Sequence, residues 1–422
     1  MARKKRALLM TVGTGVGDEK NKYSLAHGLM CSIDSKNPDL ICFFGSNASE
    51  FTINALKKLF NEKFNEDFDE CFENEFIRND KIDKFNDYFR DFKLKISELE
   101  DDYKILIDYT SGTKTMTMAA AFASMVFQKE LFVVTGERKD GVVVQGTEEC
   151  KSQNLYQIYD ELMTNKVKEL FNDNRFESGK IFLNEITDQN KDKEVFSKLL
   201  DTYYYFDSVN HEKAFEIFDI KEFKKTWPDL SKQFELNIKA LNIMNKLNPD
   251  PNNPNEFREH NLKKYYLLAS ILNNARRRKC ENKFDDAIAR LYRSLELIAQ
   301  IRLSKTYNID SSNVDINILK EHNLDEEYLS KLDTSGEIKF ALTADYELLA
   351  MLNDSLGDFY LKNKKEILNI LKFRNNSILA HGFESCSKKE YDEFSKIVLE
   401  AANLLHKDME KFIDETKFPI LS

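Results

Sequence analysis

The stretch Lys104-Ile-Leu-Ile-Asp108-Tyr-Thr-Ser-Gly-Thr-Lys114 joins a short apolar run to a loop of small and hydroxyl-bearing residues. The apolar run has the length and content of a buried strand, and residues 116–127 after the loop are small and apolar, as in a helix packed on a sheet. Strand, short polar loop and helix form the repeating unit of α/β domains with a largely parallel sheet. This stretch therefore predicts the fold of the N-terminal part of the chain.

Further apolar runs of strand length alternate with helical patterns through residues 1–150. The expected strands are residues 6–12, 40–45, 104–109, 131–135 and 142–144, the last two joined by a hairpin across residues 139–141. The expected helices are residues 23–33, 49–64 and 116–127, and residues 65–100 are expected to be helical without clear boundaries. The alternation predicts a Rossmann-like sheet.

Two loops that follow expected strands are candidates for ligand binding. Gly13-Thr14-Gly15 and Ser111-Gly112-Thr113-Lys114 offer backbone N–H groups, hydroxyls and a helix N-terminus, which suit phosphate groups or nucleobase edges. In open α/β sheets the ligand crevice lies outside the carboxyl ends of the strands. The first loop lacks the third glycine of G-x-G-x-x-G, and the second has its glycine too close to Lys114 for a Walker A motif. A simple tight turn for the first loop and helix capping by Thr113 stay open as alternatives.

Composition and charge restrict the classes of function. A chain of 422 residues is expected to form two or three domains. The net charge of −10 argues against a broad nucleic-acid-binding surface, so any RNA contact is expected to be local. The six cysteines and six histidines are scattered, which predicts reduced thiols in the cytoplasm and no metal site. No apolar run approaches the ~20 residues needed to span a bilayer, so no membrane segment is expected.

The second half of the chain is expected to be helical. Residues 155–247 are rich in aromatic residues at helical spacing, and no chemistry is visible in them. Residues 248–255 contain three prolines and four asparagines, which predict a linker. The amphipathic segments after it are residues 257–279, 284–303, 337–354, 363–380 and 388–416. They predict a helical bundle.

Within this bundle, residues 370–382 contain a candidate catalytic pair. Arg374 and His381 are seven positions apart, which on one helix is two turns or about 10 Å, and Gly382 is expected to end that helix. A permanently charged guanidinium and a titratable imidazole suit phosphodiester chemistry. A surface helix that carries both residues without a function is the alternative.

Arg374-Asn375 with His381 six positions after Asn375 resembles the Arg-x4–6-His motif of HEPN ribonucleases. Residues 11–15 (Thr-Val-Gly-Thr-Gly) and 108–116 (Asp-Tyr-Thr-Ser-Gly-Thr-Lys-Thr-Met) resemble the two ligand loops of CARF domains, the sensor domains of type III CRISPR-associated proteins. The chain is therefore similar to CARF–HEPN ribonucleases of the Csm/Csx type. The implied fold is α/β plus all-α: a Rossmann-like CARF domain (1–150), a helical connector (151–256) and a HEPN bundle (257–422).

The resemblance also implies an activity. A homodimer would bind a cyclic tetra- or hexa-adenylate across its sensor domains, and the ring would activate cleavage of single-stranded RNA without metal or cofactor, leaving a 2′,3′-cyclic phosphate. His381 would act in proton transfer or phosphate positioning, Arg374 would stabilise phosphoryl charge, and Asn375 would orient a phosphoryl oxygen or the substrate. No partner protein besides a second copy is expected. The implied ring-binding residues are Thr11, Gly13, Thr14, Gly15, Thr110, Ser111, Gly112, Thr113 and Lys114.

Several alternatives stay open. A ring nuclease that only degrades the cyclic oligoadenylate would not need His381, and some relatives cut their activator with a hydroxyl equivalent to Thr113. A non-catalytic nucleotide-sensing regulator would share the sensor domain, but no basic recognition helix is visible. A nicotinamide-dependent oxidoreductase would need the missing third glycine. Arg290 and Arg293 are candidates either for the RNA cleft or for a solvated helix face. A spacing of about 10 Å is too large for Arg374 and His381 of one chain to bind the same phosphate. Arg374 is therefore expected to lie beside His381 of the partner subunit.

Overall fold

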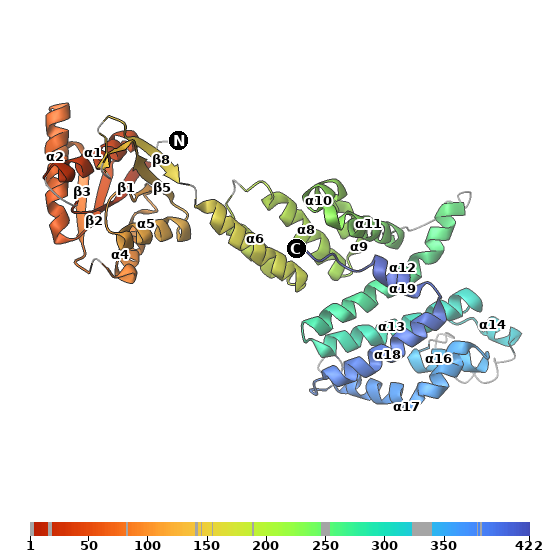
Figure 1. Ribbon diagram of the computed structural model, residues 1–422. Helices are drawn as coiled ribbons and strands as arrows, with labels where there is room; N and C mark the ends of the chain where they lie inside the picture. The colour runs from red at the N-terminus through yellow and green to blue at the C-terminus, as the bar shows by residue number, and fades with distance from the viewer. Residues whose placement is uncertain are drawn as a thin grey trace. The chain divides into compact units, whose positions relative to one another are not determined.

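The computed structural model describes residues 4–15, 19–81, 83–139, 142–144, 146–153, 155–187, 190–245, 254–322, 340–377, 379 and 382–422. The chain forms two compact units, Met1–Leu162 and Met163–Ser422 (Figure 1). The first unit contains the sheet, and the second is helical. An α/β unit followed by an all-α unit confirms the predicted fold class.

The first unit is built on a six-stranded sheet with the order β3-β2-β1-β4-β5-β8. Its strands are β1 (Lys5–Val12), β2 (Leu40–Gly45), β3 (Glu73–Arg78), β4 (Tyr103–Asp108), β5 (Glu130–Thr135) and β8 (Glu149–Gln153). The first five run parallel, and β8 pairs antiparallel with β5. The strand order reverses between β1 and β4, which pair directly, with Leu8 opposite Leu106. This is the switch point at which Rossmann-like sheets bind ligands.

Helices cover both faces of the sheet because successive side chains of a strand point to opposite faces. On one face, Leu8 and Met10 of β1 pack with α1 (Glu19–Lys36) and α2 (Glu50–Phe64). On the other face, Leu9 packs with side chains of two further helices. These are α4 (Phe85–Leu99) and α5 (Lys114–Val126); the shorter elements of the unit are η1 (Asn47–Ser49), α3 (Phe68–Cys71), β6 (Arg138–Lys139) and β7 (Val142–Val143).

Two strands of this sheet were not predicted from the sequence. β3 lies within the stretch expected to be helical, and β8 was not expected at all. Both are edge strands of polar sequence, Glu-Asn-Glu-Phe-Ile-Arg and Glu-Cys-Lys-Ser-Gln, with no fully buried residue. The expected strand at 142–144 is β7, which pairs with β6 in a separate two-stranded sheet and does not join the main one. The tip of that hairpin, residues 140–141, lies outside the described residues.

The second unit is a set of helices around one continuous hydrophobic core. Helix α6 (Tyr156–Asn172) begins in the first unit and continues into the second. The other helices of the second unit are α7 (Phe176–Asn184), α8 (Lys193–Asp207), α9 (His211–Ile217), α10 (Ile220–Thr226), η2 (Pro228–Leu230), α11 (Ser231–Asn245), α12 (Pro254–Cys280), α13 (Phe284–Thr306), α14 (Ile316–Glu321), α16 (Leu342–Met351), α17 (Ser355–Asn376), α18 (Lys388–Leu405) and α19 (Met409–Glu415). The C-terminal segment is part of this core: the ring of Phe418 packs against Tyr203 and Phe206 of α8, with ring centroids 4.8 and 5.1 Å apart. The predicted linker falls largely on residues 246–253, outside the described residues.

Candidate functional site

The two predicted ligand loops meet at the switch point of the sheet. Because β1 and β4 are neighbours, their carboxyl ends lie side by side, and each passes directly into one of the loops. The Gly13 N–H donates to Ser111 Oγ at 2.9 Å, and the Thr11 hydroxyl donates to the Ser111 carbonyl. The structure thus brings together two segments about one hundred residues apart in sequence.

Close approach of the two backbones explains the glycines at this contact. A Cβ atom on Gly13 would lie 2.9 Å from the Gly112 nitrogen and 3.0 Å from its Cα. Those are backbone atoms that cannot rotate away, so only glycine fits at position 13 without displacing a loop. Gly112 itself has φ +121°, a conformation that side chains rarely adopt.

The predicted ring-binding residues divide into two groups. Thr11 is fully buried, and the Thr110 hydroxyl accepts from the Val134 N–H at 2.8 Å, so both hold the loops in place. Thr113 Oγ1 accepts from the Met116 N–H at 3.3 Å and caps α5. In contrast, the exposed positions of the two loops are Thr14, Gly112 and Lys114, the last in the first turn of α5; Gly15 is partly exposed and has φ +72°.

Three supporting residues outside the two loops, Ser32, Ser49 and Thr52, were missed from the sequence. Thr52 Oγ1 donates to the Gly13 carbonyl at 2.9 Å, and Ser49 Oγ donates to the Val12 carbonyl at 2.7 Å. Beneath the second loop, the Asp108 carboxylate accepts from Ser32 Oγ at 2.5 Å and from the Thr110 N–H at 2.8 Å. Burial raises the pKa of Asp108, and these two hydrogen bonds oppose that shift. In the sequence, only their polar side chains distinguish these residues, because their contacts with the loops form through the fold.

The predicted catalytic stretch departs from the expected helix. Helix α17 ends at Asn376, and Ser377 is extended, with φ −78° and ψ 162°. The prediction that one helix carries both Arg374 and His381 is therefore wrong. The reason is local: the Ser377 N–H and Oγ both donate to the Arg374 carbonyl, at 3.2 and 2.8 Å, and replace the next helical bond. Without the helix, the 10 Å spacing that favoured a site shared between subunits no longer applies.

The chain beyond Ser377 folds back on the end of α17. The Glu384 N–H donates to the Asn376 carbonyl at 3.0 Å, and the Gly382 N–H donates to the Ser377 carbonyl at 3.2 Å. A Cβ atom on Gly382 would lie 2.0 Å from the Asn376 carbonyl oxygen. The prediction that Gly382 ends the helix is therefore wrong: the helix ends at Asn376, and Gly382 packs against that end. His381 lies outside the described residues.

Arg374 and Asn375 are in the last turn of α17, and the Arg374 guanidinium has an unusual environment. It lies over the ring of Tyr292 of α13, 4.6 Å from the centroid, and Nη1 donates to Asn375 Oδ1 at 3.1 Å. Among the residues that the structure describes, Arg374 forms no ion pair, and its buried Nε has no hydrogen-bond partner. A positive charge that pairs with no carboxylate in the described part of the chain suits the binding of an anion.

The two arginines considered for the RNA cleft have different surroundings. Arg290 is engaged within the unit, donating to Asn274 Oδ1 and to the Asp286 carboxylate. Arg293 is half-exposed and pairs with Glu296 at 3.3 Å and with Gln300 at 3.1 Å. It directly follows Tyr292, whose ring lies under Arg374.

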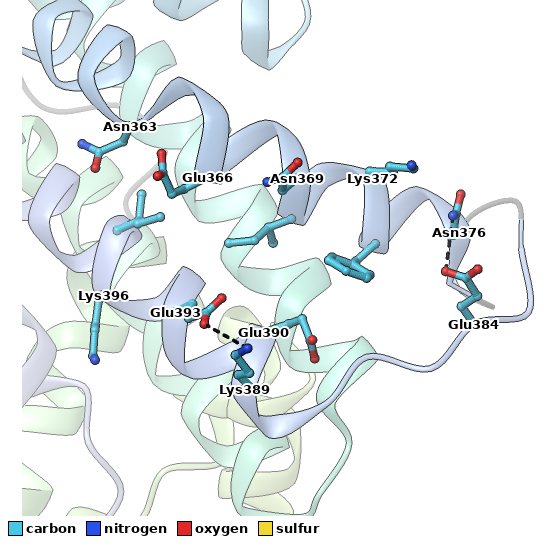
Figure 2. Close-up of a pocket in the computed structure, with 13 residues that line it drawn as sticks. Asn363, Glu366, Asn369, Lys372, Asn376, Glu384, Lys389, Glu390, Glu393 and Lys396 are labelled. Atoms are coloured by element: carbon cyan, nitrogen blue, oxygen red, sulfur yellow. Dashed lines mark hydrogen bonds and ion pairs between the residues drawn. The ribbon is translucent and has the colours of Figure 1, made fainter.

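A groove of about 910 Å³ lies between α17 and α18, next to this stretch (Figure 2). It is lined by Asn363, Glu366, Asn369, Ile370, Lys372, Phe373, Asn376, Glu384, Lys389, Glu390, Glu393, Lys396 and Ile397. Four glutamates face three lysines there, so the charge of the groove does not favour a polyanion. Neither Arg374 nor Asn375 lines it.

Neither a cluster of metal ligands nor a spanning helix is found within the described ranges. No three His, Cys, Asp or Glu side chains there converge as a metal site would require. Among the helices described, none has the length and apolar content to cross a membrane.

Comparison with known proteins agrees with this arrangement. Residues 256–405 match the family model of the Csm6 HEPN domain. The fold is similar to that of Enterococcus italicus Csm6 bound to cyclic hexa-2′-fluoro-hexa-dAMP, with 14% identity and a TM-score of 0.61 over 98% of this chain and 95% of that chain. No curated protein sequence matches.

Can2 from Sulfobacillus thermosulfidooxidans, in complex with cyclic tetra-adenylate, aligns over 49% of this chain and 68% of that chain. Its identity of 8% and TM-score of 0.23 are too low to carry an argument. The resemblance seen in the sequence agrees with these comparisons: residues 256–405 match the Csm6 HEPN domain, and the chain has a Csm6-like fold with an N-terminal α/β unit.

Proposed function

We propose that this protein is an endoribonuclease that cleaves single-stranded RNA in type III CRISPR defence and is activated by a cyclic oligoadenylate. The observation that carries the proposal is the match of residues 256–405 to the Csm6 HEPN domain, which includes Arg374, Asn375 and His381. An Arg374 side chain without an ionic partner among the described residues supports a role in binding phosphate.

The sensor half of the proposal rests on the paired loops of the first unit. They meet at the switch point and leave Thr14, Gly112 and Lys114 exposed beside the N-terminus of α5. Backbone N–H groups and a lysine in this position suit the phosphates or base edges of a nucleotide ring. The similar Csm6 holds a ring of six nucleotides, which makes cyclic hexa-adenylate the first ligand to test and cyclic tetra-adenylate the second.

The catalytic half needs no cofactor because the RNA supplies the nucleophile. The 2′-oxygen attacks the adjacent phosphorus, its proton passes to a base, and the bond from phosphorus to the 5′-oxygen breaks as that oxygen is protonated. The products are a 2′,3′-cyclic phosphate and a 5′-hydroxyl. In this scheme His381 transfers a proton or positions the phosphate, Arg374 stabilises charge on the phosphoryl oxygens, and Asn375 orients one of them.

We further propose a cytoplasmic homodimer in which the site is completed across a two-fold axis. Four exposed apolar side chains on and after α17 support an interface with a second copy, which would cover them. They are Leu361, Leu368, Phe373 and Phe383, of which Phe383 is 96% exposed. A two-fold interface duplicates every contact, so one dimer would hold two equal sites.

The test is product analysis with purified variants in EDTA. Wild-type protein with the activating ring is expected to release RNA ends that carry a 2′,3′-cyclic phosphate. Arg374→Ala and His381→Ala are each expected to abolish cleavage while ring binding persists. Loss of wild-type cleavage in EDTA with recovery in magnesium, or full activity of Arg374→Ala, would show that the reaction occurs elsewhere. Destruction of the ring with the RNA left intact would favour the ring nuclease.

A further inference from the structure

Tyr292 is placed to hold the Arg374 guanidinium from one side. The centre of the guanidinium is 4.6 Å from the ring centroid, within the range of a favourable cation–π contact. The two residues come from different helices, α13 and α17, so the contact fixes the last turn of α17 against its neighbour.

The ring is itself held in place. Tyr292 is partly buried and packs against the hydrophobic core of the unit, and burial together with the nearby Glu296 carboxylate raises the pKa of Tyr292 to about 12. Glu296 in turn pairs with Arg293 at 3.3 Å. Packing against the core therefore restrains the tyrosine, whose ring lies under the Arg374 guanidinium.

Three other arginines of this unit are held by carboxylates, in contrast to Arg374. Arg277, Arg278 and Arg290 each donate to an aspartate, which consumes N–H groups and neutralises their charge. An aromatic ring contacts the flat face of a guanidinium and leaves the N–H donors, which point outward in its plane, available. The ring also leaves the full positive charge in place. Such support suits an arginine that must bind the oxygens of a phosphate in the transition state.

We propose that Tyr292 is a positioning residue of the nuclease site: its ring stacks on Arg374 and orients that guanidinium toward the scissile phosphate without competing for its donors. This inference rests on the proposed function, in which Arg374 acts in RNA cleavage. It adds a residue outside the Arg374–His381 motif, on another helix and 82 positions earlier in the chain.

The first experiment compares two substitutions of tyrosine by leucine. Tyr292→Leu removes the ring beside Arg374, and we expect kcat for RNA to fall roughly 2- to 30-fold, the range of a cation–π contact, while KM changes less than about twofold. Tyr265→Leu is the matched control, because Tyr265 also contacts a cation at 4.6 Å, that of Lys305, and does not contact Arg374. Both substitutions are expected to lower Tm, but Tyr265→Leu should leave kcat unchanged. Equal kcat for the two variants, or wild-type kcat for Tyr292→Leu, would overturn the proposal.

A second series separates the ring from the hydroxyl and does not depend on folding of the leucine variant. Tyr292→Phe keeps the ring and is expected to retain most of the wild-type kcat. Replacing that phenylalanine by analogues with one, two and three ring fluorines changes the shape little but withdraws charge from the ring face. We expect kcat to fall stepwise with each fluorine while Tm stays nearly constant. A flat series would overturn the stacking role.

Arg374→Ala in the same assay distinguishes failure of this inference from failure of the proposed function. Cleavage that persists in Arg374→Ala would refute the function itself. Cleavage that is lost in Arg374→Ala, together with an unaffected Tyr292→Leu, would refute the positioning role alone.

Discussion

Substitution of Gly13 by alanine tests whether contact between the two loops builds the ring site. The new Cβ would lie 2.9 Å from the Gly112 nitrogen, several tenths of an ångström inside ordinary contact, and both partners are backbone. Overpacking of this kind typically costs about 1–3 kcal/mol. Alanine restricts the unfolded chain and returns about 0.4–1 kcal/mol, so the net loss of unfolding free energy is at most about 2.6 kcal/mol. For a unit of this size that corresponds to a fall in Tm of at most about 10 °C.

The same displacement should weaken activation, because the loops must return to their present spacing to bind the ring. Strain of about 1–3 kcal/mol predicts a 5- to 150-fold higher ring concentration for half-maximal RNA cleavage. Gly28→Ala is the control: its Cβ would meet only Thr110 Cγ2, at 3.7 Å, and helix α1 should gain about 0.5–1 kcal/mol. Urea unfolding and an activation titration measure both effects. A Gly13→Ala protein as stable and as readily activated as Gly28→Ala would refute the reasoning.

Three further predictions concern other parts of the chain. Lys114→Ala removes an exposed cation at the start of α5 and should raise the ring concentration needed for activation, without altering the oligomeric state. An activation titration measures this effect, and a wild-type response would exclude the lysine from the pocket. Mixing Arg374→Ala with His381→Ala should restore part of the cleavage if subunits share a site, whereas a mixture that stays inactive despite proven subunit exchange would place each site within one subunit. Burial raises the pKa of Asp345 to about 7, so ionisation of this carboxyl destabilises the unit increasingly as pH rises from about 4 to 7. Asp345→Asn should therefore raise Tm at pH 8 and change it little at pH 4. Equal shifts in Tm at both pH values would contradict this.

The central part of the sheet was predictable because its strands contain continuous apolar runs. β1, β2 and β4 are flanked by partners on both sides and covered by helices, so they appear in the sequence as continuous hydrophobic runs. β3 and β8 are edge strands with charged side chains, and such strands are defined by pairing with a neighbour more than by their own residues. Pairing of this kind is not visible in one sequence.

The two loops were predictable for the same reason, since each directly follows a buried strand. Their supports were not, because Ser32, Ser49 and Thr52 reach the loops only through the fold. The end of α17 shows another limit. Leu371 and Phe373 continue the helical pattern up to Arg374, but hydrogen bonds from Ser377 to the Arg374 carbonyl end the helix two residues later. A hydrophobic pattern gives no sign of a side chain whose hydrogen bonds compete with those of the helix.

In the proposed function, a nucleotide ring bound to the first unit controls RNA cleavage by the second. The most direct measurement is the rate at which the purified protein cleaves a fluorescent single-stranded RNA in EDTA, with and without cyclic hexa-adenylate or cyclic tetra-adenylate. We predict a steep rise in rate with one of these rings and none with ATP or linear AMP. Equal rates with and without either ring would contradict the claim.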